Sequence, residues 1–110
     1  MRTPLTIPQG TSWGISWPVT ENGEAAAIDA WTVKAQIRST PTSPTVLHEW
    51  STEAGNATTE GSAVTLLLNP ASSTAWTWKR GVYDVELISP DGTVYRIAEG
   101  AVYVSPEVTR

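Results

Sequence analysis

The sequence predicts an all-β protein that folds as a single β-sandwich. Three observations support this prediction: apolar and polar residues alternate over several short segments, turn-forming residues separate these segments, and eight prolines spread along the chain leave no room for a long helix. Alternation with a period of two is typical of a strand with one buried and one exposed face. Regularly spaced short strands of this kind favour a sandwich of Ig-like (immunoglobulin-like) or related topology.

The alternation is clearest over residues 31–38. One face carries Trp31, Val33, Ala35 and Ile37, and the other carries Thr32, Lys34, Gln36 and Arg38. The same pattern recurs over residues 13–19, 64–68 and 83–87. We therefore expect eight or nine short antiparallel strands, near residues 3–8, 12–20, 25–29, 31–39, 45–50, 62–68, 81–89, 93–98 and 101–105.

Turn and capping signals lie between these segments. Asn22-Gly23 readily supplies the two positive φ angles of a tight hairpin turn, and Ser89-Pro90-Asp91-Gly92-Thr93 predicts a second turn. Asn69 followed by Pro70 predicts the N-cap and first residue of one helical turn that crosses between the sheets. Residues 40–45 and 52–61 lack apolar anchors and are predicted to be exposed loops.

A chain of 110 residues fits one domain, so we assign residues 1–110 to a single sandwich with an extended, proline-bounded N-terminal arm over about residues 1–10. The sequence contains no cysteine, which excludes disulfides and thiolate metal sites. The fold therefore has to be held together by packing and hydrogen bonds.

The charge distribution argues against nucleic acid and anionic membranes as partners. The formal net charge is −4, the isoelectric point is about 4.8, and the seven Lys and Arg residues are scattered. No segment is long and apolar enough to span a bilayer, and the N-terminus lacks the apolar core of a signal peptide. We expect a protein that is made in the cytoplasm without Sec export.

The sequence offers little catalytic chemistry. The single histidine, His48, has no nucleophile signature around it and is interpreted as a half-exposed strand residue. Asp84 and Glu86 share one strand face, but it is the polar face, where solvation leaves neither carboxyl tuned as an acid. We expect no enzymatic activity, cofactor or metal ion.

Six tryptophans and three tyrosines, with no phenylalanine, are the unusual feature of the composition. Trp13, Trp17 and Trp31 fall on inward-facing rows, and Trp76 is assigned to the core. The remaining two are predicted to be exposed. Trp78 with Lys79 and Arg80 is typical of an anchor for a protein partner. The alternative is a carbohydrate-binding module, in which exposed Trp side chains form a platform for a host glycan.

The order of several segments also resembles a known group of proteins. These segments are 5–13 with the turn at 21–23, 28–38, 81–87 with the turn at 89–93, and Glu99-Gly100-Ala101-Val102-Tyr103-Val104-Ser105-Pro106 with the residues that follow. In this layout the chain resembles the small LtfC-like β-sandwich proteins of tailed bacteriophages of actinobacteria. It is more loosely similar to the N-terminal sandwich domain of BppU baseplate proteins.

This resemblance implies a non-enzymatic structural component of a tailed-phage virion, with no catalytic residues to carry over. A minor tail or tail-tip protein is the leading expectation, and a capsid decoration (minor capsid) protein is the alternative. The expected partners are other virion structural proteins, and multiple copies would be placed by virion symmetry. We expect partner contacts through Trp50, Trp78, Lys79 and Arg80, and through Leu5 and Ile7 of an N-terminal arm that packs onto a neighbour.

Overall fold

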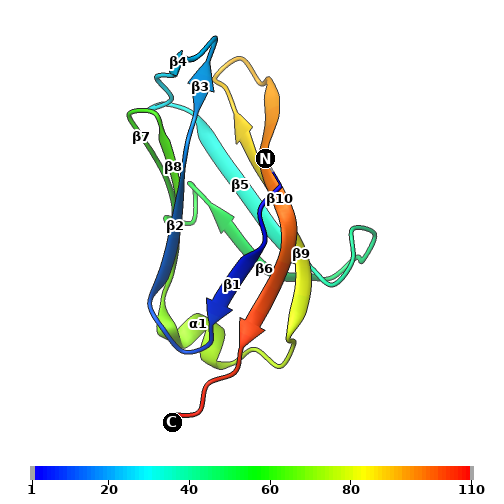
Figure 1. Cartoon of the computed structure of the whole chain (residues 1–110). Helices are drawn as coiled ribbons and strands as arrows, with labels where there is room; N and C mark the ends of the chain where they lie inside the picture. Colours follow the sequence, from blue (N-terminus) through cyan, green and yellow to red (C-terminus); the bar gives the residue numbers. More distant parts are fainter. Residues whose placement is uncertain (1, 110) are drawn as a thin grey trace.

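Two β-sheets face each other in the computed structural model, which describes residues 2–109 (Figure 1). The larger sheet has the order β1-β10-β9-β5-β6, with β1 (Leu5–Pro8), β10 (Val94–Ser105), β9 (Arg80–Ile88), β5 (Thr32–Arg38) and β6 (Val46–Ser51). The smaller sheet has the order β2-β8-β7, with β2 (Trp13–Pro18), β8 (Ala63–Leu68) and β7 (Ala57–Glu60). The predicted all-β sandwich is confirmed.

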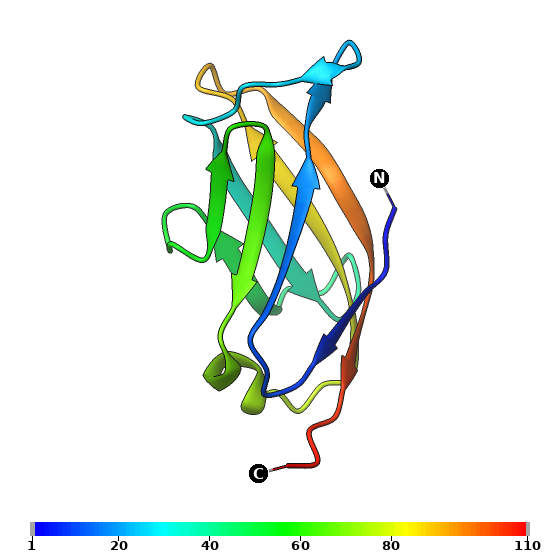
Figure 2. The same ribbon diagram turned by 60° about the vertical axis from the view of Figure 1, so that its left-hand side comes forward.

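Two small elements complete the fold. A hairpin of β3 (Thr20–Glu21) and β4 (Glu24–Ala25) projects at one end, and the helical turn α1 (Pro70–Thr74) carries the chain from β8 to β9 at the other (Figure 2). Asn22 and Gly23 both have positive φ, as the sequence predicts for this hairpin turn. The Asn69 side chain accepts a hydrogen bond from the Ser72 backbone N–H, so Asn69 is the predicted N-cap.

The strand order is that of an immunoglobulin-type Greek key. In such folds one sheet carries strands B, E and D, and the other carries G, F and C. β2, β8 and β7 occupy the positions of strands B, E and D, and β10, β9 and β5 occupy those of strands G, F and C. The first strand, β1, lies in the sheet of β9 and β10 and leaves the position beside β2 without a strand in residues 2–109.

The predicted strand at 3–8 is present as β1, but the expectation that the strands are antiparallel is wrong for it. β1 pairs with β10 in parallel, with Leu5 opposite Val102 and Ile7 opposite Val104. Leu5 and Ile7 are buried core residues, because the hydrophobic row of β1 faces the second sheet. The N-terminal segment is thus an edge strand of this domain.

Three other boundaries differ from the sequence prediction. Residues 93–98 and 101–105 form the single strand β10, which contains an irregularity between Arg96 and Ala98. Part of the predicted loop at 52–61 is β7, whose Ala57 is buried. The predicted strand at 25–29 ends at Ala25, although Ile28 is buried and its N–H donates to the Gly61 carbonyl.

Indole rings fill the space between the sheets. Trp50 of β6 has no exposed surface, and its Nε1 donates to the Leu67 carbonyl of β8 at 2.9 Å. Trp17 of β2 stacks on Tyr83 of β9 with ring centroids 6.4 Å apart. The Trp17–Tyr83 contact joins β2 to β9, the strands that correspond to B and F, which antibody domains join with a disulfide; this chain has no cysteine.

The docking of β1 depends on two groups near Thr3. The Tyr83 hydroxyl donates to the Thr3 carbonyl at 2.6 Å. A Cβ added at Gly100 would lie 2.5 Å from the same carbonyl oxygen, so only glycine permits this close approach. Burial, together with the nearby Glu99 carboxylate, raises the pKa of Tyr83 to about 12.

We predict that Trp50→Phe destabilises the protein by about 2 to 4 kcal/mol, because it leaves a void and removes the Nε1 hydrogen bond to the Leu67 carbonyl. Urea unfolding measures this change. Trp78→Phe is the matched control: Trp78 Nε1 is buried without a hydrogen-bond partner among the described residues, so its removal should cost much less. Equal losses in the two variants would contradict the role given to the Trp50 hydrogen bond.

We predict that Tyr83→Phe lowers stability by about 1 kcal/mol at pH 8, since it removes the hydrogen bond to Thr3. Because the folded pKa of Tyr83 lies above the unfolded value of 10.0, the unfolded chain loses this proton first and wild-type stability falls as pH rises from 10 towards 12. The variant lacks this loss. The difference in unfolding free energy between wild type and Tyr83→Phe should therefore be smaller at pH 11 than at pH 8. A larger difference at pH 11 would contradict the raised pKa of Tyr83.

Candidate interaction surface

A basic and aromatic surface lies at the end of the larger sheet where β9 begins. We define the Arg80–Tyr103 patch as Lys79, Arg80 and Tyr103. Arg80 on β9 is directly opposite Tyr103 on β10, and its guanidinium carbon lies 5.5 Å from the centre of the Tyr103 ring. This distance is within the range of a cation–π contact. Tyr103 is 42% exposed, so the contact is open to solvent.

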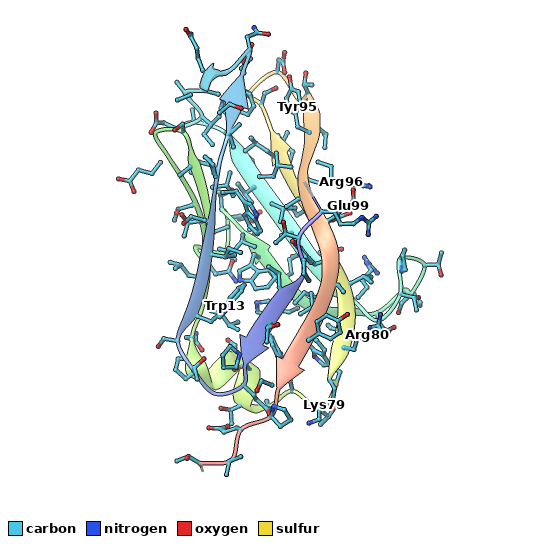
Figure 3. The ribbon with its side chains drawn as sticks, in the orientation of Figure 1. Trp13, Lys79, Arg80, Tyr95, Arg96 and Glu99 are labelled. Carbon is cyan, nitrogen blue, oxygen red and sulfur yellow. The ribbon has the colours of Figure 1, made fainter. Side chains whose placement is uncertain are left out.

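Local structure holds this patch in place. Lys79 precedes β9, and its carbonyl accepts a hydrogen bond from the Val104 N–H of β10 at 2.9 Å. Figure 3 shows Lys79 and Arg80 at the end of the sandwich where the C-terminal segment leaves β10. Side chains alternate along β10, so Tyr103 points outward between the buried Val102 and Val104.

The structure separates the other predicted contact residues from this patch. Trp50, Leu5 and Ile7 are buried, so the prediction that they contact a partner is wrong for the folded domain. Trp78 is only half-exposed and packs on Trp76 with ring centroids 4.6 Å apart. The predicted pair of exposed tryptophans, Trp50 and Trp78, does not exist because both rings belong to the core or its margin.

An aromatic chain extends from the core to the α1 end of the sandwich. Trp13, Trp50, His48, Trp76 and Trp78 form successive ring contacts, with centroid separations between 4.5 and 6.3 Å. His48 lies edge-on between Trp50 and Trp76, and its Nε2 is buried without a partner among the described residues. Burial lowers the pKa of His48 below its usual value of 6.5, and the Glu49 carboxylate opposes part of that shift.

The outer face of the larger sheet is a shallow, charged hollow of about 740 Å³. Cations and anions alternate across it. Arg96 lies 3.5 Å from Asp84, Arg2 lies 3.5 Å from Glu99, and Lys34 sits opposite Glu86 in the pairing of β5 with β9. Asp84 and Glu86 thus lie on the outward face, as predicted, and each has a cationic neighbour. Such exposed pairs stabilise weakly. Arg38 and Arg80 also line the hollow, so five cationic side chains face three carboxylates there.

A second exposed aromatic site lies at the opposite end. Trp31 and Tyr95 stack with ring centroids 5.8 Å apart beside a hollow of about 400 Å³, which Glu21 and Arg96 also line. Tyr95 is 47% exposed, whereas Trp31 is partly covered. One ring therefore covers part of the other, and the pair offers a single free aromatic face.

Comparison with known proteins adds no identification: no family model matches the chain, and no curated protein matches it. Within residues 2–109, no helix is long and apolar enough to cross a membrane. Over the same residues, no group of three or more His, Asp or Glu side chains is arranged to hold a metal ion.

Sequence reasoning found Lys79 and Arg80 but missed the aromatic partner. Tyr103 alternates with Val102 and Val104, and this pattern alone marks it as an exposed aromatic residue on a half-buried strand. Tyr95 gives no such signal, because the irregularity between Arg96 and Ala98 interrupts the alternation of β10.

We predict that His48→Phe makes the protein less sensitive to acid. Between the lowered folded pKa and 6.5, the unfolded chain binds more protons at His48 than the folded chain, so wild-type stability falls as pH decreases through this window. Phenylalanine preserves an aromatic ring between Trp50 and Trp76 and takes up no proton. Unfolding free energies at pH 7 and pH 5 measure the effect.

Glu49→Gln is the control for this prediction. It removes the one charge that favours protonated His48, so the loss of stability on acidification should remain in that variant. If wild type and His48→Phe lose the same free energy between pH 7 and pH 5, His48 does not carry the effect.

Proposed function

We propose that this chain is a non-enzymatic structural component of a tailed-phage virion, a minor tail or tail-tip protein that binds neighbouring virion subunits through the Arg80–Tyr103 patch. The observation that carries the proposal is the exposed Arg80–Tyr103 contact with Lys79 beside it. Arg and Tyr are enriched where proteins bind one another, and a few such residues supply most of the binding free energy.

The geometry of the patch suits a protein partner. Arg80 and Tyr103 stand on β9 and β10, the two longest strands, which pair along most of their length. Their backbones are thus held before a partner arrives, and the guanidinium already lies over the ring. Little side-chain freedom remains to be lost on binding, which favours affinity.

The resemblance to LtfC-like phage proteins is the second support, because it rests on the order of strand and turn segments over most of the chain. The N-terminal contact through Leu5 and Ile7 is not part of the proposal, since both side chains are buried. Capsid decoration is the alternative location within the virion. In either place, repeated sites on a symmetric particle would bind multiple copies.

A carbohydrate-binding module is the second candidate, and only the Trp31–Tyr95 site favours it. A sugar ring stacks on an exposed aromatic face, and Tyr95 offers one above a hollow that Glu21 and Arg96 line with polar groups. Trp50 and Trp78 offer no such platform. The two candidate functions therefore depend on opposite ends of the sandwich and can be tested separately.

We predict that Tyr103→Ala and Arg80→Ala each weaken the association with the tail or capsid partner by at least tenfold, which corresponds to about 1.4 kcal/mol. The association is measured by titrating the purified chain into the structural proteins of its parent particle, followed by quantification of the chain in assembled particles. Tyr95→Ala is the matched control, because it removes an equally exposed tyrosine at the other end.

Two outcomes would count against the virion role. One is a wild-type chain that binds no tail or capsid protein of its particle. The other is full incorporation of the Tyr103 and Arg80 variants. Binding to a glycan array that Tyr95→Ala abolishes and Tyr103→Ala leaves intact would favour the carbohydrate-binding module instead.

A further inference from the structure

The two sheets have four edge strands, β1, β6, β2 and β7. Prolines leave the β1 edge with few N–H groups that a further strand could bind. The N–H groups of Thr3 and Gln9 donate towards β10, to Glu99 and Ser105. Because backbone groups alternate along an extended strand, residues 4, 6 and 8 face away from β10. Pro4 and Pro8 have no N–H, so Thr6 has the only outward donor along this edge.

A side-chain amide covers much of the β6 edge. The Asn56 carboxamide accepts a hydrogen bond from the Ser51 N–H at 2.9 Å and donates to the Glu49 carbonyl at 3.1 Å. These are the groups that a neighbouring strand would otherwise bind. The Ser51 carbonyl also accepts from the Gly55 N–H. Asn56 thus takes the place of a paired strand over the second half of β6.

The segment that leads into β5 lies along the outer edge of β7. The Thr59 hydroxyl donates to the Asp29 carbonyl at 3.1 Å and lies 3.3 Å from that of Trp31. At the end of β7, the Gly61 N–H donates to the Asp29 carboxylate and the Gly61 carbonyl accepts from Ile28. The chain itself therefore covers the end of this edge.

The β2 edge has no comparable cover in residues 2–109. The Val19 N–H donates to the Ser62 carbonyl of the segment leading into β8. Because backbone groups alternate along a strand, the N–H and C=O groups of Trp13, Ile15 and Trp17 also point towards β8. The backbone groups of Gly14 and Ser16 consequently point away from the sheet. Both residues are exposed, and the topology places no strand beside them. A Cβ added at Gly14 would meet only atoms of Leu66 and Leu67.

We propose that the β2 edge is an interface at which a second copy of this chain pairs in antiparallel orientation. A two-fold axis at Ile15 would place Gly14 of each copy opposite Ser16 of the other. In this register both residues exchange N–H···O=C hydrogen bonds with the second copy, so all the outward groups of Gly14 and Ser16 are paired. The two small sheets would then form one continuous sheet across the dimer.

Three features favour a second copy over an unrelated strand. The register is self-complementary, as a two-fold interface requires. β2 and its neighbour β8 contain no ionisable side chain, so two copies with a net charge of −4 each meet where neither is charged. The outward side chains at Gly14 and Ser16 are small, whereas natural edge strands that resist pairing carry lysine, proline or a bulge. The one proline on this edge, Pro18, is the last residue of β2 and lies outside the Gly14–Ser16 pairs.

The fold also leaves room for this pairing. In immunoglobulin constant-type sandwiches, strand A lies beside strand B in the B-E-D sheet. Here the first strand pairs with β10, and β2 of the second copy would occupy the position that strand A takes elsewhere. On the outer face, Leu67 sits opposite Gly14 and is 49% exposed, which provides apolar surface next to the new strand.

Sedimentation of the full chain as a function of concentration tests the proposal. We expect the mass to rise from 11.8 kDa towards twice this value. Ser16→Lys should weaken the dimer at least tenfold, because it places a lysine from each copy near the two-fold axis. Thr58→Lys adds the same charge to the outer face of the same sheet, on β7, and should leave the dimer unchanged.

Amide hydrogen exchange of the wild type identifies the surface without a mutation. We expect the Gly14 and Ser16 amides to gain protection as the dimer forms, while the outward Thr6 amide of β1 gains none. Ser16→Pro removes one outward donor without adding charge and should also weaken the dimer.

The proposal is overturned by a mass that stays at one copy at about 1 mM, or by a dimer that forms equally well with Ser16→Lys and Ser16→Pro. Protection of Gly14 and Ser16 that appears only when another protein is added also overturns it, in favour of a heterologous strand. Self-association and incorporation into a particle are measured separately, so this proposal and the virion role can fail independently.

Discussion

The contact between Trp50 and the Leu67 carbonyl is the interaction on which the rest of this sandwich depends. A chain without cysteine has to join its sheets through side chains, and packed sheets lie about 10 Å apart. An indole is large enough to span much of this gap, and its N–H can satisfy a backbone carbonyl at the far side. Trp17 and Tyr83 make a second connection, and the aromatic chain through His48 continues the packing to α1. The tryptophan-rich composition thus has a structural explanation, and only part of the aromatic content remains at the surface.

The placement of β1 decides which surfaces the molecule offers. Pairing with β10 buries Leu5 and Ile7, and this removes the N-terminal segment as an arm for neighbouring subunits. It also depends on the close approach of Thr3 to Gly100 and on the Tyr83 hydroxyl. The same placement takes the first strand away from β2. The pairing of β1 with β10 therefore places prolines at one edge of the larger sheet and leaves the β2 edge of the smaller sheet without a neighbouring strand.

The exposed chemistry of the larger sheet lies on its charged outer face and at its Arg80–Tyr103 end. The outer face of the larger sheet carries five of the seven cationic side chains and three carboxylates, and Arg2–Glu99 and Arg96–Asp84 form ion pairs on it. Arg80 also lines this face, and together with Tyr103 it is exposed and held on paired strands. A patch of this kind at one end and an open strand at the side are the two features through which such a domain could enter a repeated assembly. They lie on different sheets, so one copy could use both at once.

The sequence by itself determined the all-β class, the inward rows of β5, β8 and β9, the Asn22-Gly23 turn and the cap at Asn69, because each depends on local periodicity or on the conformational preference of a few neighbouring residues. It also marked Lys79 and Arg80. Only the tertiary structure decided that β1 runs parallel to β10, that Trp50 lies inside while Tyr103 lies outside, and that Asn56 covers one edge while β2 remains uncovered. These outcomes depend on which strands become neighbours. A period of two gives each strand an apolar face but carries no information about its partner across the sheet or about the side chain that meets it from the opposite sheet.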